Sequence, residues 1–225
     1  MKKVIITGSE GLIGKEVSAY LALQGYECIL LDYSLGNDLT DEGYVRDFFA
    51  NNKASGLVNL FALNHHIDIG TEKSNLFNIS LDSFKSYMDV NLTALFSVCR
   101  EYARNNQEGS IVNFSSTYGV DSPRKDLYDG EEKHIGYSVS KAGVIMLTKH
   151  LATHLSPNVR VNCIIPGGVY NNQSVQFVKK YSQLTPMKRM MKNGELSGMV
   201  DFLLSDKASY ITGAEFKVDG GWTAW

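Results

Sequence analysis

Short apolar runs alternate with longer segments in which apolar residues recur every three or four positions. The runs are continuous, a pattern typical of parallel strands that are buried on both faces of a sheet. They predict strands at residues 4–7, 28–31, 57–63, 111–114, 159–165 and 215–218. The three- and four-residue spacings predict helices around residues 13–21, 44–49, 84–102, 137–155 and 196–203, with Thr40 as the N-cap of the second helix.

The alternation of strands and helices predicts an α/β fold. We expect a Rossmann-like, doubly wound parallel sheet in three α/β/α layers, because crossover helices must bury their apolar stripes against both faces of the sheet. One domain is predicted to span residues 1–225. Open parallel sheets bind ligands beyond the carboxyl ends of their strands, so the residues that follow each strand carry the functional predictions.

Composition excludes several function classes. With 44% hydrophobic and 20% charged residues, a chain of 225 residues can bury a core. The net charge of −2 and the lack of a basic block argue against a nucleic-acid partner. No stretch approaches the roughly 18 apolar residues of a membrane span. The three cysteines form no CxxC pair, which predicts buried thiols, a cytoplasmic location and no metal site.

A glycine-rich turn follows the first predicted strand. Gly8 permits a tight turn, Gly11 lets the backbone approach a pyrophosphate, and Gly14 allows close packing of helix and strand. The free N–H groups of the helix N-terminus then face the anion. Asp32 ends the second strand, where a carboxylate binds an adenosine ribose and repels a 2′-phosphate, so NAD(H) is favoured over NADP(H). The alternative for Asp32 is a solvated strand end.

Tyr137 and Lys141 lie four residues apart at the start of a predicted helix and share one face. A cation beside a phenol favours the phenolate, so we expect Lys141 to lower the pKa of Tyr137 and to fit it for general acid–base catalysis. Together with the glycine turn and the strand that ends at Ser115 and Ser116, this pair resembles the short-chain dehydrogenase/reductase family in its single-domain form. The resemblance covers nearly the whole chain.

The resemblance implies roles for individual residues. Tyr137 is the expected general acid/base, Lys141 binds the nicotinamide ribose, and Ser116 hydrogen-bonds the reacting oxygen, with Ser115 as the fallback. Asn91 is expected to help hold a proton-relay water, and the alternative is a hydrogen-bonded core asparagine. The expected cofactor-binding residues are Gly8, Ser9, Gly11, Leu12, Ile13, Gly14, Asp32, Tyr33, Asp38, Leu39, Ala62, Asn91, Tyr137, Lys141, Pro166, Gly168 and Val169.

Three departures from the family pattern carry expectations of their own. The glycine spacing resembles that of the longer, extended family members. Only five residues separate Asp32 from Asp38, which with Leu39 resembles the family's adenine-contacting pair. The usual intervening helix and strand are therefore expected to be missing, which leaves the second strand at or near an edge of the sheet. Leu60 stands where the family has an asparagine that ties neighbouring strands together.

Two polar segments are expected to shape the substrate side of the site. The stretch at residues 122–134 is longer than the family pattern, and its Arg124, Lys125 and His134 either contact a polar or phosphorylated substrate or belong to a solvated loop. Residues 170–173 include three consecutive amide side chains, which either suit hydroxyl-rich ligands or form a solvated turn.

We therefore predict an NAD(H)-dependent oxidoreductase that interconverts a secondary hydroxyl and a ketone on a small polar substrate such as a sugar, in carbohydrate metabolism. Two alternatives stay open: a catalytically silent nucleotide-binding sensor or assembly subunit, and an NAD-bound sugar epimerase or dehydratase. The resemblance implies a homodimer or homotetramer assembled through the helices that carry Asn91 and Tyr137. The apolar tail at residues 222–225 suits burial in such an interface or within the chain.

Overall fold

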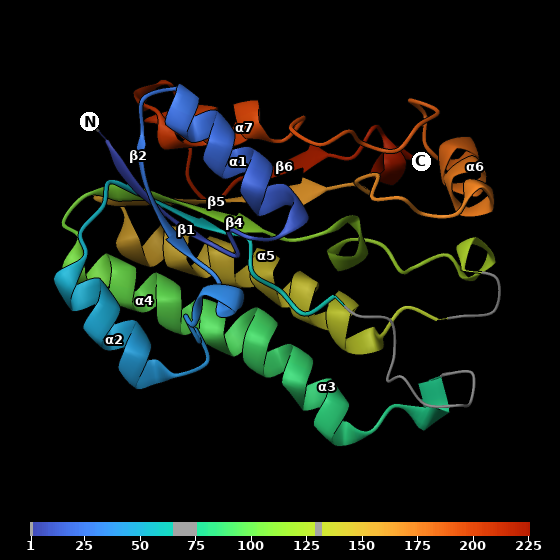
Figure 1. Cartoon of the computed structure of the whole chain (residues 1–225), viewed down its shortest axis with the longest axis horizontal. Helices are drawn as coiled ribbons and strands as arrows, with labels where there is room; N and C mark the ends of the chain where they lie inside the picture. Colours follow the sequence, from blue (N-terminus) through green and yellow to red (C-terminus); the bar gives the residue numbers. More distant parts are fainter. Residues whose placement is uncertain (1, 65–75, 129–131) are drawn as a thin grey trace.

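Six parallel strands form one sheet in the computed structural model, which describes residues 2–64, 76–128 and 132–225 (Figure 1). The strands are β1 (Lys3–Thr7), β2 (Glu27–Leu31), β3 (Gly56–Asn59), β4 (Gly109–Phe114), β5 (Val159–Pro166) and β6 (Glu215–Val218). Their order across the sheet is β2-β1-β3-β4-β5-β6, and every neighbouring pair is parallel. The predicted doubly wound α/β fold is confirmed.

Helices cover both faces of this sheet, as Figure 1 shows. The helices are α1 (Leu12–Leu23), α2 (Glu42–Asn51), α3 (Leu81–Met88), α4 (Leu95–Asn105), α5 (Ile135–Leu155), α6 (Val175–Leu184) and α7 (Ser197–Leu204). Alternate strand residues point to opposite faces, so Ile5 and Leu57 pack in the core beneath α2, α4 and α5, while Ile6 and Val58 pack beneath α1 and α7. Among the described residues, no helix combines the length and apolar character needed to cross a membrane.

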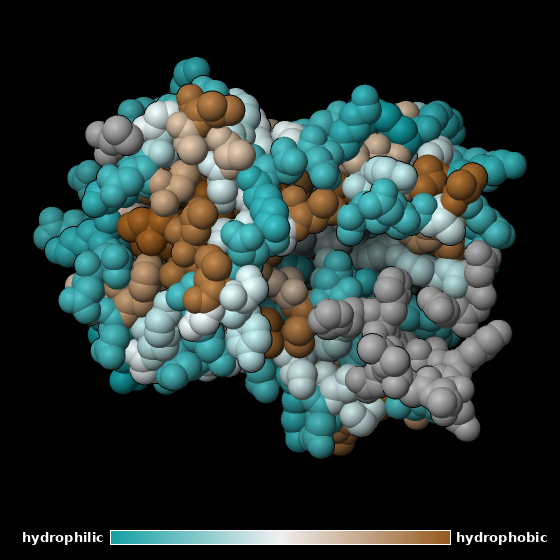
Figure 2. Space-filling view, in the orientation of Figure 1, coloured by the Kyte–Doolittle hydropathy of each residue, from teal (hydrophilic) through white to brown (hydrophobic). Residues whose placement is uncertain are grey.

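The sheet ends at β2, as the short interval after Asp32 predicts. Beyond β2 the chain makes one 3-10 turn at Tyr33–Leu35, which Gly36 closes with a φ of 83°, and it enters α2 without forming another strand. Leu30 in this edge strand is 40% exposed, and Figure 2 shows hydrophobic side chains on the side of the molecule where β2 lies. Five residues are too few for a helix and a strand, so the adenine-side edge is truncated.

Two predicted boundaries are wrong. Asp41 rather than Thr40 is the N-cap of α2, because the Asp41 carboxylate accepts hydrogen bonds from two first-turn N–H groups. The strand predicted over residues 57–63 ends at Asn59. The chain must leave the sheet there, because the next residues pack directly against the turn at Gly8, where β1 also ends.

The helix predicted over residues 84–102 is divided. A π-helical turn at Asp89–Ala94 joins α3 to α4, and Asn91 lies within it. Such turns insert an extra residue into the helical repeat and occur frequently at functional sites. Apolar periodicity alone did not predict this turn, because its effect on the spacing is only one residue. The helix α6, which packs over the carboxyl end of β5 through Tyr181, was not predicted either.

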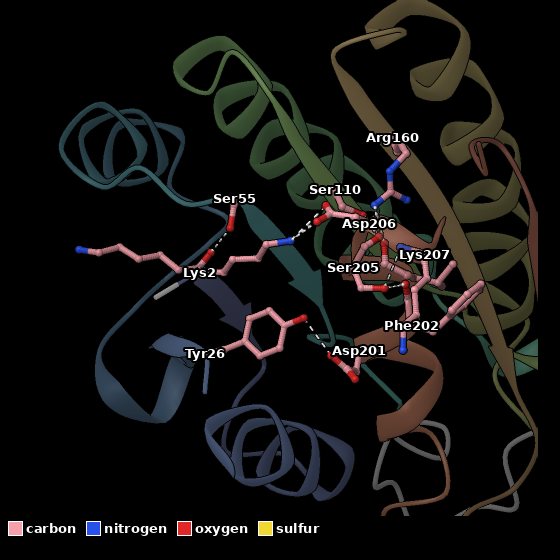
Figure 3. A network of polar contacts seen from close by, with 12 residues as sticks. Lys2, Tyr26, Ser55, Ser110, Arg160, Asp201, Phe202, Ser205, Asp206 and Lys207 are labelled. Carbon is pink, nitrogen blue, oxygen red and sulfur yellow. Dashed lines mark hydrogen bonds and ion pairs between the residues drawn. The ribbon is translucent and has the colours of Figure 1, made fainter. Parts of the chain in front are cut away.

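Polar contacts fasten α7 to the amino ends of the strands (Figure 3). The Tyr26 hydroxyl donates a hydrogen bond to Asp201 of α7 at 2.8 Å. The backbone carbonyl of Leu203 accepts hydrogen bonds from Arg160 at 2.8 Å and from Ser110 at 2.9 Å. These contacts satisfy carbonyls at the end of α7 and hold it at the amino ends of the strands. The cavity described next lies at the carboxyl ends of the strands.

Candidate active site

A cavity of about 760 Å³ opens beyond the carboxyl ends of β1, β3, β4 and β5. It joins the glycine turn, the first turns of α5 and one side of α6. The predicted site residues that line it are Gly8, Gly11, Leu12, Ile13, Gly14, Ala62, Ser116, Tyr137, Lys141, Pro166, Gly168 and Val169. The other predicted residues lie outside its lining: Ser9, Asp32, Tyr33, Asp38, Leu39 and Asn91.

The three glycines of the turn differ in what surrounds them. Gly8 has a φ of 70°, and a side chain there would overlap the backbone of Phe61. A side chain on Gly14 would overlap the carbonyl of Gly8, so only glycine at this position lets α1 approach the turn so closely. At Gly11 a Cβ would meet only the Gly8 carbonyl, at 3.3 Å, and would otherwise face the cavity.

The start of α1 suits an anionic ligand. Gly11 is its N-cap, and no side chain caps the first N–H groups. Such groups need an acceptor, and a phosphate beside a helix N-terminus supplies one. The open approach at Gly11 leaves room for the ligand, so the residues present fit the pyrophosphate of a dinucleotide.

Asp32 lies beside this turn at the end of β2. Its carboxylate accepts hydrogen bonds from the backbone N–H of Glu10 at 3.1 Å, and from the N–H and hydroxyl of Ser34 at 2.9 and 2.8 Å. Burial raises the pKa of Asp32, but these hydrogen bonds and the nearby Lys15 outweigh burial and hold the pKa below its ordinary value. Asp32 is therefore an anion at neutral pH that also braces the glycine turn.

The other residues predicted on the adenine side have different environments. Tyr33 is 79% exposed. Asp38 accepts hydrogen bonds from the N–H and hydroxyl of Thr40 at 2.9 and 2.6 Å. Leu39 is buried in the core beneath α2. The side chain of Leu39 thus packs into the protein, while both hydrogen bonds of Asp38 use one carboxylate oxygen and leave the other for a ligand.

Tyr137 and Lys141 project from the first turns of α5 into the cavity, and both are buried. The Lys141 ammonium lies 5.9 Å from the centre of the Tyr137 ring and donates a hydrogen bond to the Phe114 carbonyl at 2.8 Å. The Ser116 side chain also lines the cavity, accepts a hydrogen bond from the Tyr118 N–H at 3.1 Å, and is a polar group that lowers the pKa of Tyr137. Ser115 instead donates its hydroxyl proton to the Lys141 carbonyl at 2.8 Å, which favours Ser116 over Ser115 as the serine available to the reacting oxygen.

The pKa expected for Tyr137 is wrong in this structure. Burial raises the pKa of Tyr137, although the hydrogen bond with Ser116 lowers it in part. Burial also lowers the pKa of Lys141 to about 8. The ammonium is hydrogen-bonded to the Phe114 carbonyl rather than to the phenol, so loss of solvent outweighs its attraction for the phenolate.

Asn91 holds the turn after β3 against α5. Its side-chain oxygen accepts a hydrogen bond from the Leu63 N–H at 2.7 Å, and its amide nitrogen donates to the Leu63 carbonyl and the Ser140 hydroxyl, both at 3.0 Å. Ser140 in turn donates to the Tyr137 carbonyl at 2.8 Å. The side chain of Asn91 thus has the contacts of a core asparagine, and they end on the backbone of Tyr137.

Asn59 ties the strands together, although Leu60 lacks the amide expected at its position. Asn59 accepts a hydrogen bond from the Thr7 hydroxyl at 3.0 Å and donates to the Asn113 side chain at 2.9 Å. Asn113 then donates to Thr148 of α5 at 3.0 Å. This buried row crosses from β1 to α5 directly behind the cavity. The two asparagines stand in otherwise apolar strands, and that pattern was the signal available in the sequence.

The wall farthest from the glycine turn is largely aromatic. Tyr118, Tyr128, Phe177 and Tyr181 line it, the last two from α6. None of them was predicted as a site residue, because no spacing in the sequence connects them. The three tyrosine hydroxyls are hydrogen-bonded. Tyr118 and Tyr128 share a hydrogen bond of 2.6 Å, and Tyr181 accepts one from the Gly168 N–H at 2.6 Å.

The amide side chains after β5 have different environments. Gln173 accepts a hydrogen bond from the Asn171 N–H at 2.7 Å and donates to the Val169 carbonyl at 3.1 Å. Asn172 has a φ of 56° and lies outside the cavity lining. Gln173 therefore braces its own turn, and of the three amides Asn171 is the one whose side chain is left for a ligand.

The three candidates on the long loop do not line the cavity. Arg124 is exposed, and Lys125 pairs with Glu132 at 3.2 Å. His134 is buried, accepts a hydrogen bond from the Gly136 N–H at 2.9 Å as the N-cap of α5, and stacks on Tyr87 with ring centres 4.2 Å apart. For His134 neither of the two alternatives describes the structure, because its ring is buried, lies outside the cavity lining and fastens the start of α5.

Lys133 is a cavity residue that the sequence did not single out. Its ammonium lies 4.8 Å from the centre of the Tyr137 ring, and it donates hydrogen bonds to the side chain and carbonyl of Asn64. Lysines on polar loops are usually solvated, so its position in the chain carried no signal. Among the described residues, no cluster of three His, Cys, Asp or Glu side chains is placed to hold a metal ion.

The C-terminal tail divides between the protein interior and the surface. Trp222 is buried and stacks on Tyr181 with ring centres 4.5 Å apart, which supports α6 from behind. Trp225 is 70% exposed. Burial within the chain, one of the two possibilities left open for the tail, therefore accounts for Trp222.

Comparison with known proteins gives three kinds of match. The sequence pattern of the family described as enoyl-(acyl carrier protein) reductase matches residues 31–223. The 3-oxoacyl-(acyl-carrier-protein) reductase FabG of Aquifex aeolicus is 33% identical over 233 residues, which cover 97% of this chain and 86% of that protein. The post-translational flagellin modification protein A of Campylobacter coli is 35% identical over 125 residues, 54% of this chain and 49% of that protein.

Solved structures agree with these relatives. The short chain dehydrogenase of Leptospira borgpetersenii serovar Hardjo-bovis, solved with bound NAD+, has a TM-score of 0.84 and 30% sequence identity. The match covers 99% of this chain and 92% of that one.

Proposed function

Because the chain belongs to the short-chain dehydrogenase/reductase family, and is therefore an oxidoreductase that uses a nicotinamide cofactor, we propose that it interconverts a secondary hydroxyl and a ketone on a small polar substrate, with NAD(H) as cofactor. The prediction of an enzyme is confirmed by the family, which counts against the alternative of a silent binding module. The observation that carries the proposed reaction is the convergence of Tyr137, Ser116 and Lys141 on one cavity with the glycine turn.

The residues that would hold the cofactor follow from the cavity. The uncapped N–H groups of α1 and the open face of Gly11 suit the pyrophosphate, and Asp32, which accepts a hydrogen bond from the Glu10 N–H of that turn, would bind the adenosine ribose. Lys141, the backbone of Ala62 and the segment from Pro166 to Val169 line the other end. When bound, the nicotinamide accepts or donates the hydride.

The chain's own residues supply position and the proton. Tyr137 takes the proton from the substrate hydroxyl or returns it to the ketone oxygen, and Ser116, which lines the same cavity and lowers the pKa of Tyr137, is the second polar group for that oxygen. Lys141 binds the cofactor's ribose. Asn91 acts through Ser140 on the backbone of Tyr137, and a proton-relay water at Asn91 stays a prediction.

The experiment is a cofactor titration combined with a substrate panel. We expect NADH fluorescence to report binding, and NADH to accumulate when the protein turns over a polar secondary alcohol in the presence of NAD+. Binding without NADH accumulation on any alcohol, but with conversion of a sugar, would support the epimerase or dehydratase alternative instead. Carbohydrate metabolism remains our proposal for the pathway class, although the matched FabG relative is named a 3-oxoacyl-(acyl-carrier-protein) reductase.

Asp32→Asn tests the cofactor preference. The change removes a negative charge from the ribose end of the site, so the ratio of kcat/KM for NADPH to that for NADH should rise about tenfold, which corresponds to about 1.4 kcal/mol. Glu27→Gln, which neutralises an exposed carboxylate on the same strand, is the matched control and should leave the ratio unchanged. An unchanged ratio in Asp32→Asn would remove Asp32 as the determinant of NAD(H) preference.

We also propose a homodimer or homotetramer built on the helices that carry Asn91 and Tyr137. Three large apolar side chains on these helices are partly or largely exposed: Phe96, Val139 and Met146 are 42%, 44% and 64% exposed. Light scattering measures the assembly. We propose that residues 1–225 form one domain. The cytoplasmic location expected from the three free cysteines of the chain stays a prediction.

A further inference from the structure

The cavity carries two lysines and, among the described residues, no carboxylate. Lys141 has a place in the proposed reaction and a hydrogen bond to the Phe114 carbonyl. Lys133 has no place in the proposed reaction. It comes from the lengthened loop before α5, which departs from the family pattern. Cofactor binding therefore leaves one feature of the cavity unexplained, the positive charge of Lys133, which no carboxylate in the described lining balances.

The surroundings of Lys133 direct its side chain into the cavity. The next residue, His134, is buried, caps α5 and stacks on Tyr87, so the backbone at Lys133 is fixed. The ammonium lies 4.8 Å from the centre of the Tyr137 ring. Its other neighbour, Glu132, is turned away, since its carboxylate pairs with Lys125 and accepts a hydrogen bond from the Leu76 N–H.

The ammonium of Lys133 is half-buried and has no carboxylate partner among the described residues. Its hydrogen-bond acceptors are the side chain and carbonyl of Asn64, both uncharged. Burial lowers the pKa of Lys133 to about 8, which shows that the charged form is destabilised by loss of solvent. An anion in the cavity would compensate that loss, because opposite charges attract more strongly where water is excluded.

We propose that Lys133 binds a carboxylate of the substrate, so that the substrate is a hydroxy acid or the corresponding oxo acid. This inference rests on the proposed function, since it places the carboxylate beside the alcohol that Tyr137 deprotonates. A carboxylate matches one ammonium in charge, whereas phosphate sites usually gather several donors, and apart from Lys141, which is assigned to the cofactor's ribose, the described cavity lining offers only Lys133 as a cation. The nearness of Lys133 to the Tyr137 ring puts the carboxylate close to the reacting carbon.

The test compares acids with their neutral amides. The probes are lactate, 3-hydroxybutyrate and gluconate, each assayed with NAD+ beside its primary amide. In the wild-type protein at least one acid should be turned over with a kcat/KM at least about tenfold above that of its amide. Lys133→Met should remove this preference by raising KM for the acid, while the amide is affected little. Lys133→Arg keeps the charge and should retain the preference.

Lys125→Met is the matched control, because Lys125 lies on the same loop but outside the cavity lining. Lys133→Gln is a second neutral variant, and circular dichroism verifies that each variant is folded. A wild-type protein that prefers the amides, or an acid preference that survives in both Lys133→Met and Lys133→Gln, would overturn the inference while leaving the oxidoreductase proposal intact.

A binding measurement separates failure of the inference from failure of the proposed function. Saturation-transfer NMR should detect 3-hydroxybutyrate more strongly than 3-hydroxybutyramide on the wild-type protein, with and without NADH, and the difference should vanish in Lys133→Met. An acid preference in a protein that never turns over an alcohol would support the carboxylate site and count against the reaction. Equal signals for acid and amide would overturn the carboxylate site whatever the turnover.

Discussion

Tyr137→Phe is expected to lower kcat by about 10²–10⁴-fold, the range that a positioned general acid or base contributes. The change removes one oxygen and no ring contact, so NADH should bind as tightly as before. Single-turnover reduction of NAD+ and NADH fluorescence titration measure the two quantities separately. A loss confined to kcat is expected because the phenol acts on the proton in transfer and does little to hold the cofactor.

Tyr118→Phe is the control from the same cavity. Its hydroxyl shares a hydrogen bond with the Tyr128 hydroxyl, and it has no part in the proposed reaction. Its loss should therefore cost far less in kcat than the loss of the Tyr137 hydroxyl. Near-normal turnover by Tyr137→Phe, or equal losses in both variants, would assign the proton transfer to another group.

The direction of the pKa shift gives the pH dependence its sign. Burial raises the pKa of Tyr137, so the phenol stays protonated through neutral pH in the protein without ligand. Ketone reduction needs that proton and should not be limited by Tyr137 at neutral pH, whereas alcohol oxidation needs the phenolate and should accelerate as the pH rises. An oxidation rate, measured as kcat/KM, that falls between neutral and mildly alkaline pH would contradict this assignment.

The sheet was predictable from the sequence because its strands are buried on both faces. Continuous apolar runs such as those around Ile5 and Val112 are typical of such strands. In the structure, Ile5 lies in β1 and Val112 lies in β4. The deletion after Asp32 was visible as a count of residues, which cannot depend on packing. The π-helical turn at Asn91 and the helix α6 were missed because their positions depend on contacts between segments far apart in the chain, such as Asn91 with Leu63.

The candidate site was predictable where one short motif carries the geometry. The Gly8 turn and the Tyr137–Lys141 pair each have a fixed spacing, and the fold places both on one cavity. The pKa of Tyr137 was not predictable, because it depends on how deeply the ring is buried and on which acceptor Lys141 contacts. Lys133 illustrates the same limit, since only the fixed backbone at the start of α5 turns it inward.

The glycine turn gives the second large effect, because Gly11 and Gly14 should separate cofactor binding from stability. Gly14→Ala forces a methyl group into the Gly8 carbonyl, so the turn must move. We expect it to lower the free energy of unfolding by about 1–3 kcal/mol, as overpacking typically does, and to weaken NADH binding severely. Urea unfolding and NADH fluorescence titration measure the two effects.

Gly11→Ala should weaken NADH binding while leaving stability nearly unchanged. Its φ of −68° is allowed for alanine, and the added methyl group meets only one carbonyl oxygen, at 3.3 Å, before it enters the cavity. The methyl group would occupy space that the pyrophosphate needs. A change in NADH affinity below about twofold, less than 0.5 kcal/mol, would mean that the cofactor does not approach this backbone.

Gly198→Ala completes the comparison as a control in a helix away from the cavity. Nothing lies within 4 Å of a Cβ built at Gly198 in α7, so alanine should raise the free energy of unfolding by about 0.5–1 kcal/mol through helix propensity and leave NADH binding as it was. The three variants add the same methyl group at three glycines. Stability should fall only at Gly14 and binding only at Gly11 and Gly14, because the first depends on space inside the protein and the second on space left for the ligand.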